Sequence, residues 1–432
     1  MPPLWQQCCG SASGGDNGGV KRVRTATTAG PVGGGAAGAN LGALRSHNTA
    51  LVLGLLRDAG AEGISRLELA ERTGLTPQAV SKITARLRAQ GLAAEAGRRA
   101  STGGKPRTVL RLVPEAGHAV GVHLDRDELR VVLVDLDGSV VGERRGELDL
   151  GAGAEAVLGA VCGAVRGVAG GLGAGAGADA RVGPGAEAGA GRGGDGTSAG
   201  GGGLAGVGSL LGVGVALPGP LDHARGVLHR VTGFPEWDGF PLRDALAERL
   251  GVPVVVDKDT NAAALGLAVG GEEGAAGRSF AYLHLGTGLG AGLVIDGSVH
   301  RGARTGAGEF GHQVVQLDGP LCGCGNRGCV EVLCLGAAAR GEVAEAARVL
   351  GVAAGNLVGL LDIDVVLLGG RTVAGAPETY VSGVGEVLGA RARREGTGGD
   401  AVPVRLAPRG ERIVAEGAAQ LLLAPLFGRG DD

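Results

Sequence analysis

The chain has 432 residues, enough for two or three domains, and its formal net charge of −3 does not by itself indicate an acidic or a basic partner. Its 90 glycines and its aromatic content of 2% indicate a core of small residues together with disordered insertions. No uninterrupted apolar run approaches the roughly 18 residues of a membrane span, and the start of the chain lacks the pattern of a signal peptide. We therefore expect a cytoplasmic protein without a membrane partner.

Two segments are unlike the rest of the chain. Residues 1–43 are rich in Gly, Ala, Ser and Thr without periodicity, which predicts a flexible arm. In residues 170–209, 27 of 40 positions are Gly or Ala. Such a composition cannot offset the entropy lost on ordering, so we predict a loop inserted into a folded domain.

The ordered part of the chain opens with a helix-turn-helix pattern. After a first helical stretch, "SHNTALVLGLLRDAG", Ser65 is placed to cap a short helix that runs to Thr73. Gly74 lies at the turn, and Thr76 caps a second helix that begins at Pro77. In a DNA-binding helix-turn-helix, the start of the second helix contacts base edges and phosphates.

Local charge favours DNA over a purely structural role for residues 44–113. Residues 76–112 carry eight Lys or Arg against one acid, Glu95, and a Gly-rich turn between two strand-like runs is typical of a wing. The alternative is a small helical bundle with a solvated basic face. We predict DNA contacts from the caps, the second helix and the wing: Ser65, Thr76, Gln78, Ser81, Lys82, Arg86, Lys105 and Arg107.

Residues 117–428 have an α/β pattern. Two β-rich runs and a turn at residues 137–138 predict a meander, and buried-strand candidates then alternate with helical stretches. The strand candidates are "LLGVGVALPGP", "VPVVVDKDT", "FAYLHLGTGLGAGLVI" and "IDVVLLGG". A layered α/β domain is therefore expected after the helix-turn-helix.

The order of motifs resembles that of the ROK family of sugar kinases and sugar-responsive repressors. The motifs that carry the resemblance, over residues 45–425, are the winged helix, "LGVGVALPGP", "DKDTNAAALG", "LGTGLGAG", "GAGEFGH", "CGCGNRGCVE" and "VVLLGG". The resemblance implies an N-terminal winged helix-turn-helix followed by a two-lobed, actin-like (ribonuclease-H-like) sugar kinase fold. It also implies that a sugar binds in the cleft between the lobes.

A metal site is predicted where cysteine is concentrated. His312, Cys322, Cys324 and Cys329 form a Cys₃His set within 18 residues, and glycines between them allow tight turns. Soft thiolates with one imidazole suit zinc better than calcium or magnesium, and four protein ligands leave no position for a reactive water. Similar family members carry zinc here, so we expect a structural zinc ion. The alternative is a loop of free thiols.

The resemblance also assigns sugar-binding residues. Asp259 in "DKDTN" matches the family aspartate that acts as a base in kinases and accepts a hydrogen bond in repressors. Glu309, His312 and Glu331 match positions that hold sugar hydroxyls, a role that carboxylates and imidazole suit. Lys258 departs from the pattern, because sugar-binding relatives often have asparagine at that position.

Two further departures bear on kinase activity. Kinases resembling this domain have Asp-x-Gly-Gly-Thr in the first hairpin, whereas this chain has "LDRDELR", in which Asp125 remains but bulky and acidic residues replace the glycines. ATP should therefore fit poorly, although the second loop, "GTGLGAG", is retained. In residues 335–362 we expect only two short helices, "AAARGEVAEAARVLG" and "AGNLVGLL", where relatives have a longer helical segment.

These observations predict a sugar-responsive transcriptional regulator, a repressor of genes for carbohydrate uptake or catabolism, without kinase activity. Its expected partners are double-stranded operator DNA, a small sugar or amino sugar, and a second copy of the chain in a dimer or a dimer of dimers. One alternative is an ATP-dependent sugar kinase that uses Asp259 as its base. Another is a DNA-binding protein whose sugar domain serves only dimerisation.

Overall fold

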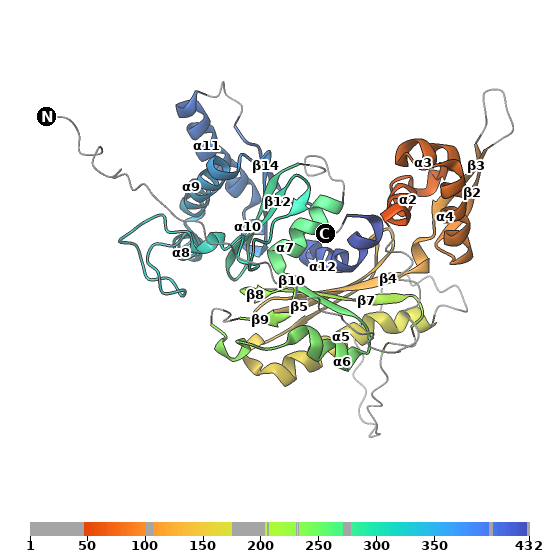
Figure 1. The fold of residues 1–432 in the computed structure, drawn as a ribbon. Helices are drawn as coiled ribbons and strands as arrows, with labels where there is room; N and C mark the ends of the chain where they lie inside the picture. The colour runs from red at the N-terminus through yellow and green to blue at the C-terminus, as the bar shows by residue number, and fades with distance from the viewer. Residues whose placement is uncertain are drawn as a thin grey trace, which may run out of the picture. The chain divides into compact units, whose positions relative to one another are not determined.

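The structure is a computed structural model, and it describes residues 47–99, 107–174, 204, 207–229, 231, 233–270, 278–396 and 401–429. The strands of the described residues form one three-stranded sheet, two five-stranded sheets and a short hairpin of β8 (Leu221–Asp222) and β9 (Val227–Leu228). The three-stranded sheet belongs to an N-terminal head, residues 47–112, and each five-stranded sheet forms the centre of one lobe (Figure 1).

The head is a winged helix. Its elements are α2 (His47–Asp58), β1 (Ile64–Ser65), α3 (Arg66–Thr73), α4 (Pro77–Ala89), β2 (Ala93–Arg99) and β3 (Arg107–Leu112). The hydroxyl oxygen of Ser65 accepts the Glu68 N–H while the Glu68 carboxylate accepts the Ser65 N–H, a reciprocal capping box. Thr76 caps α4 by accepting the Ala79 N–H, and Gly74 between the helices is left-handed. The predicted caps and turn are therefore confirmed.

The first lobe contains a sheet of order β10-β7-β4-β5-β6. Its strands are β4 (His118–Leu124), β5 (Glu128–Asp135), β6 (Val140–Glu147), β7 (Leu210–Leu217) and β10 (Val254–Lys258). β4, β5 and β6 form the predicted antiparallel meander, and β7 runs parallel to both β4 and β10. Helices α5 (Ala154–Ala174) and α6 (Leu242–Leu250) cover one face of this sheet and bury their leucines and valines against it (Figure 1).

The second lobe has a sheet of order β13-β12-β11-β14-β15. Its strands are β11 (Phe280–Leu285), β12 (Leu289–Ile295), β13 (Ser298–Val299), β14 (Val365–Gly369) and β15 (Val404–Leu406). The helices of this lobe that pack with the sheet in its core are α8 (Val330–Ala339), α9 (Val343–Leu361), α10 (Arg371–Ala374) and α11 (Pro377–Glu395). This arrangement confirms the predicted α/β class.

Two helices of small residues lie between the sheets. α7 (Asp259–Val269) and α12 (Ile413–Leu423) share a core cluster with Ala216 of the first sheet and with Phe280 and Tyr282 of the second. α12 also packs on β4 and β7. Alanine and glycine along both helices permit the close approach, which explains the low aromatic content of the sequence.

The head shares its apolar core with the first lobe and with the end of the chain. Leu53 and Leu56 of α2 belong to the same buried cluster as Val134 of β5, Ala419 of α12 and Phe427. Phe427 lies in a short 3-10 helix (Ala424–Phe427) that contacts α2. The first helix of the head is therefore anchored to the helix that lies between the two sheets.

Two predicted boundaries were wrong. α5 continues to Ala174, so the first five residues of the predicted insertion, residues 170–209, are helical, while most of its remainder lies outside the described residues. In place of two short helices in residues 335–362, the chain has the end of α8 and one 19-residue helix, α9. Both α5 and α9 contain glycines, and tertiary packing outweighs the low helix propensity of these residues.

Two of these helices, α5 and α9, are long and apolar enough to cross a membrane by length and composition alone. Both contribute buried residues to the lobe cores, such as Val161 and Val165 in α5 and Ala346 and Leu350 in α9. Core helices of globular domains have the same properties, so this observation is weak evidence for a membrane span.

Candidate functional site

A cleft of about 460 Å³ opens where the carboxyl ends of β4, β7 and β10 meet the loops of the second lobe. In sheets with parallel strands, ligands bind at this edge because the loops that follow the strands converge there. All four predicted sugar-binding residues line the cleft: Asp259, Glu309, His312 and Glu331. The structure thus brings together residues that are separated by up to 72 positions in the sequence.

The carboxylates of the cleft are held by local contacts. Asp259 is the first residue of α7, and its Oδ1 accepts the Thr260 N–H at 2.7 Å. Glu331 lies in the first turn of α8, and its Oε2 accepts the Leu289 N–H at 2.9 Å. These bonds orient both acids toward a common space, where a ligand with several hydroxyl groups would find acceptors.

Lys258 contributes a buried charge to the same cleft. Its side chain is only 3% exposed, and its Nζ donates to Glu309 Oε1 at 3.0 Å and to the carbonyl oxygen of Ala307. The neighbouring Asp257 forms a separate buried ion pair with Arg301 at 2.7 Å. Lys258 therefore occupies one oxygen of a predicted sugar-binding carboxylate, so this departure from the family pattern changes the cleft itself.

Asp259 should make the stability of the protein depend on pH. Burial raises its pKa to about 7, and the nearby Asp125 and Glu309 carboxylates act in the same direction. The folded state thus holds a proton that the unfolded state, with an aspartate pKa near 3.9, releases; stability should fall as pH rises from about 4 to 7. Asp259→Asn removes this ionisation, and each kcal/mol of stability gained at pH 8 should raise the melting temperature of a chain of this length by roughly 1 °C.

The measurement is thermal unfolding of the wild type and of Asp259→Asn at pH 5 and pH 8. For each protein, the melting temperature at pH 8 is subtracted from that at pH 5. This difference should be smaller in Asp259→Asn than in the wild type. Asp238→Asn, which changes an exposed aspartate, is the control and should behave as the wild type. An unchanged pH dependence in Asp259→Asn would contradict the assignment.

The first hairpin is tied to the opposite lobe by an arginine that the sequence analysis did not identify. Arg371 begins α10, directly after the "VVLLGG" motif, and its Nη1 and Nη2 each donate to Asp127 at 3.0 Å. Its Nη2 also lies 3.8 Å from an oxygen of Asp125. Asp125 in turn accepts the Thr287 hydroxyl at 2.8 Å. Two acids of the altered hairpin thus already have a cationic partner.

A second cavity of about 330 Å³ lies beside the first, and Asp125 and His284 line both. Burial lowers the pKa of His123 and of His284 to about 4, so both imidazoles are neutral at physiological pH. His284 Nδ1 lies 2.8 Å from the Tyr282 hydroxyl. The two cavities therefore share one neutral imidazole, His284, and one carboxylate, Asp125, a feature with no motif in the sequence.

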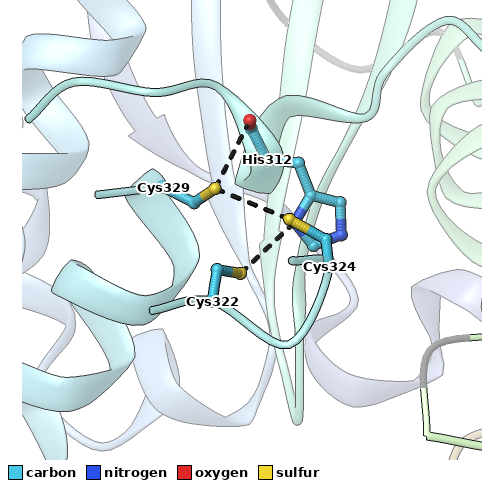
Figure 2. A group of neighbouring side chains, drawn as sticks. All are labelled: His312, Cys322, Cys324 and Cys329. Carbon is cyan, nitrogen blue, oxygen red and sulfur yellow. Dashed lines mark hydrogen bonds between the residues drawn. The ribbon is translucent and has the colours of Figure 1, made fainter. Parts of the chain in front are cut away.

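The predicted metal ligands form one cluster. The candidate ligand atoms of His312, Cys322, Cys324 and Cys329 all lie within 4.8 Å of one another (Figure 2). The Cys324 and Cys329 sulfurs are 3.7 Å apart, and Cys322 Sγ is 3.7 Å from His312 Nδ1. A tetrahedral ion with bonds of about 2.3 Å to sulfur requires separations of roughly 3.8 Å. These residues could therefore hold a tetrahedral metal ion.

Cys334, by contrast, lies outside this cluster. It is buried on α8, and its thiol donates to the carbonyl oxygen of Ala346 at 3.4 Å. Burial raises its pKa to about 12, and its sulfur contacts the backbone of α9 instead of the other three cysteines.

On the head, the structure places most of the predicted DNA-contacting residues at the surface. Gln78, Ser81 and Lys82 are exposed near the start of α4, as expected for a recognition helix. The other exposed members of the predicted set are Thr76, Arg86 and Arg107. Arg86 also donates to the Thr49 hydroxyl at 2.5 Å, and Lys105 lies outside the described residues.

Ser65 requires a correction. Its residue surface is 3% exposed, and its hydroxyl accepts the Glu68 N–H in the capping box. A buried cap cannot contact a phosphate without breaking the start of α3, so we remove Ser65 from the predicted DNA-contacting residues.

Both the N-terminal head and the lobes of the chain are similar to known proteins. Residues 50–93 match the family model described as winged helix-turn-helix DNA-binding, and residues 204–346 match that of the ROK family. The xylose repressor of Caldicellulosiruptor bescii is 27% identical over 288 residues, which cover 67% of this chain. The match spans 63% of the length of that repressor.

Two solved structures extend the comparison. A ROK hexokinase from Thermus thermophilus is 30% identical, with a TM-score of 0.51 over 70% of this chain and 96% of the hexokinase. A ROK family transcriptional regulator, a homologue of the E. coli MLC protein, is 19% identical, with a TM-score of 0.64 over 89% of this chain and 98% of its own. The second likeness shows that the fold includes both the head and the lobes. The chain therefore belongs to the ROK family.

Proposed function

We propose that the protein is a cytoplasmic, sugar-responsive transcriptional regulator that represses genes for carbohydrate uptake or catabolism. The observation that carries the proposal is that one chain contains both a winged helix and a polar cleft. The second helix of the winged helix exposes polar and basic side chains, and the cleft is lined with residues suited to binding sugar hydroxyls. The similarity to a xylose repressor supports the same function. The proposed domains are the arm at 1–43, the head at 44–113 and the sugar domain at 117–428.

In this proposal α4 enters the major groove. Gln78, Ser81 and Lys82 contact base edges or phosphates near the start of the helix, while Arg86 and the wing contact the backbone. A dimer would read two half-sites through its two heads. Because α2 shares its core with α12, between the sheets, a ligand that changes the angle between the lobes would also change the spacing of the heads.

The sugar and the metal have separate roles here. Asp259, Glu309, His312 and Glu331 hold the hydroxyls of a sugar or amino sugar, and the four-ligand cluster holds a structural zinc ion. The metal-binding loop directly precedes Glu331 at the start of α8, so its folding positions part of the cleft. Zinc would therefore support sugar binding through structure and not through catalysis.

An ATP-dependent sugar kinase is the alternative, favoured by the likeness to a hexokinase and by Asp259 as a possible base. Two features of the nucleotide side argue against it. Asp127 and Asp125 place carboxylates in the first hairpin, and the nearby Arg371 is already bound to them. The two histidines of the second cavity are neutral, so they offer no compensating charge to a triphosphate.

Binding to DNA tests the proposal. Operator fragments are selected by genome-wide mapping of bound DNA, and retention of the protein is compared with scrambled fragments at increasing salt. Lys82→Ala should lower operator affinity by about tenfold or more, because a contact at a recognition helix contributes about 1–3 kcal/mol. Arg348→Ala, which removes one exposed charge from α9, should leave it unchanged.

Two results would contradict the proposal. The first is an absence of sequence preference at every salt concentration. The second is release of ADP from ATP with a panel of hexoses and their N-acetylated forms, lost in Asp259→Asn; this would establish the kinase. Calorimetry with the same sugars separates a sensor from a domain that only dimerises.

A further inference from the structure

Arg126 brings a guanidinium group into the sugar cleft. It follows Asp125 in the hairpin between β4 and β5, and it lines the cleft together with Asp259, Glu309 and Glu331. A Cβ atom on Gly288 would lie 3.7 Å from Arg126 Nη2 and 3.2 Å from Glu331 Oε2. The absence of a side chain at Gly288 therefore leaves space directly beside the guanidinium tip.

The donors of this guanidinium have no acceptor. Its Nε is buried without a hydrogen-bond partner, and among the described residues no carboxylate lies within ion-pair distance of it. Its guanidinium carbon lies 5.9 Å from the centre of the Phe234 ring. The side chain as a whole is partly exposed, and its charge has no paired anion among the described residues, so the guanidinium is available to an anionic ligand in the cleft.

The acids of the cleft do not pair with Arg126: none in the described part of the chain is within ion-pair distance of it, and each has one oxygen engaged by another group. Asp125 accepts the Thr287 hydroxyl and the Arg126 N–H, and Glu309 accepts the ammonium group of Lys258. Glu331 Oε2 accepts the Leu289 N–H. The charge of Glu309 is balanced by Lys258, whereas the guanidinium of Arg126 has no such counter-charge within the described residues.

We propose that Arg126 is a specificity-determining residue, through which the cleft binds a sugar that carries a phosphate or a carboxylate group. A guanidinium group presents parallel N–H donors that match the oxygens of either group in a bidentate pair. The proposal rests on the proposed function of sugar sensing and names the chemical class of the ligand. Arg371 cannot take this role without giving up its hydrogen bonds to Asp127.

The test is calorimetry with the full chain, with glucose and N-acetylglucosamine, their 6-phosphates, glucuronate and inorganic phosphate as probes. We expect at least one anionic sugar to bind about tenfold or more tightly than its neutral parent. Arg126→Ala should remove that preference while changing the affinity for the neutral sugar little, and Arg126→Lys should retain part of it. Arg348→Ala, which removes a positive charge from the surface of α9, should bind as the wild type does.

The outcomes separate this inference from the proposed function. If neutral sugars bind as tightly as anionic ones and Arg126→Ala changes neither, the inference is overturned while sugar sensing stands. If inorganic phosphate alone binds as tightly as the sugar phosphates, the site binds a free anion and the inference is also overturned. If no sugar of either kind binds, sugar sensing fails as well. Thermal melting of each variant verifies that it is folded.

Discussion

Cys329→Ser is expected to abolish stoichiometric metal binding and to lower the stability of the second lobe. Cys329 is the N-cap residue of α8 and lies at one end of the loop that carries the other two cysteines. Between residues 313 and 329, the described strand contacts are two isolated bridges, Val314 with Cys329 and Leu321 with Arg327. A loop with so little regular structure depends on the ion to hold its shape.

The effect should be large because each thiolate ligand supplies much of the binding energy. Structural zinc sites bind with about 10–16 kcal/mol in small domains, and loss of one ligand leaves an incomplete coordination sphere. We expect one zinc ion per chain in the wild type by elemental analysis and less than a tenth of that in Cys329→Ser. Sugar affinity should fall in parallel, since Glu331 lies in the first turn of the helix that Cys329 directly precedes.

Cys334→Ser is the matched control for this experiment. Cys334 is as buried as Cys329, five residues further along the chain, but its thiol is directed to Ala346 and away from the cluster. This variant should keep its zinc ion. Full occupancy in Cys329→Ser, or equal metal loss in both variants, would show that the cluster does not bind the ion as described.

Gly214→Ala is expected to destabilise the fold strongly. A Cβ atom at Gly214 in β7 would lie 1.8 Å from the carbonyl oxygen of Ala418, and one at Gly121 in β4 would lie 1.9 Å from that of Ala415. Both oxygens belong to α12, which also contacts α7 and shares a core cluster with the head. The obstacle is backbone and not a flexible side chain, so α12 itself would have to move.

We expect Gly214→Ala to lower the free energy of unfolding by roughly 3 kcal/mol or more, at the upper end of overpacking effects. Chemical denaturation measures the change. Gly146→Ala, in β6 of the same sheet, is the control: a Cβ atom there meets nothing within 4 Å, and its effect should stay within about 0.5 kcal/mol. Equal midpoints for the two variants would contradict the close packing of α12.

Local features of the sequence predicted much of the fold. The caps at Ser65 and Thr76, the turn at Gly74 and the strands of the first meander depend on residues within a few positions of one another. The ends of helices that contain glycines, such as α5 and α9, were less predictable. Gly351 lies inside α9, where an added Cβ would approach Val387 of α11 to 2.9 Å, so this glycine allows the two helices to pack closely.

The sequence by itself indicated which residues form the Cys₃His cluster, the helix caps and the lining of the cleft, because each belongs to a motif or a characteristic spacing. Only the tertiary structure decided which charges are already paired. Arg371 meets Asp127 across 244 positions and Lys258 meets Glu309 across 51, whereas Arg126 has no ion-pair partner in the described part of the chain, and its buried Nε has no acceptor there. Charge pairing depends on distance in space and on burial, and neither can be read from the order of residues along the chain.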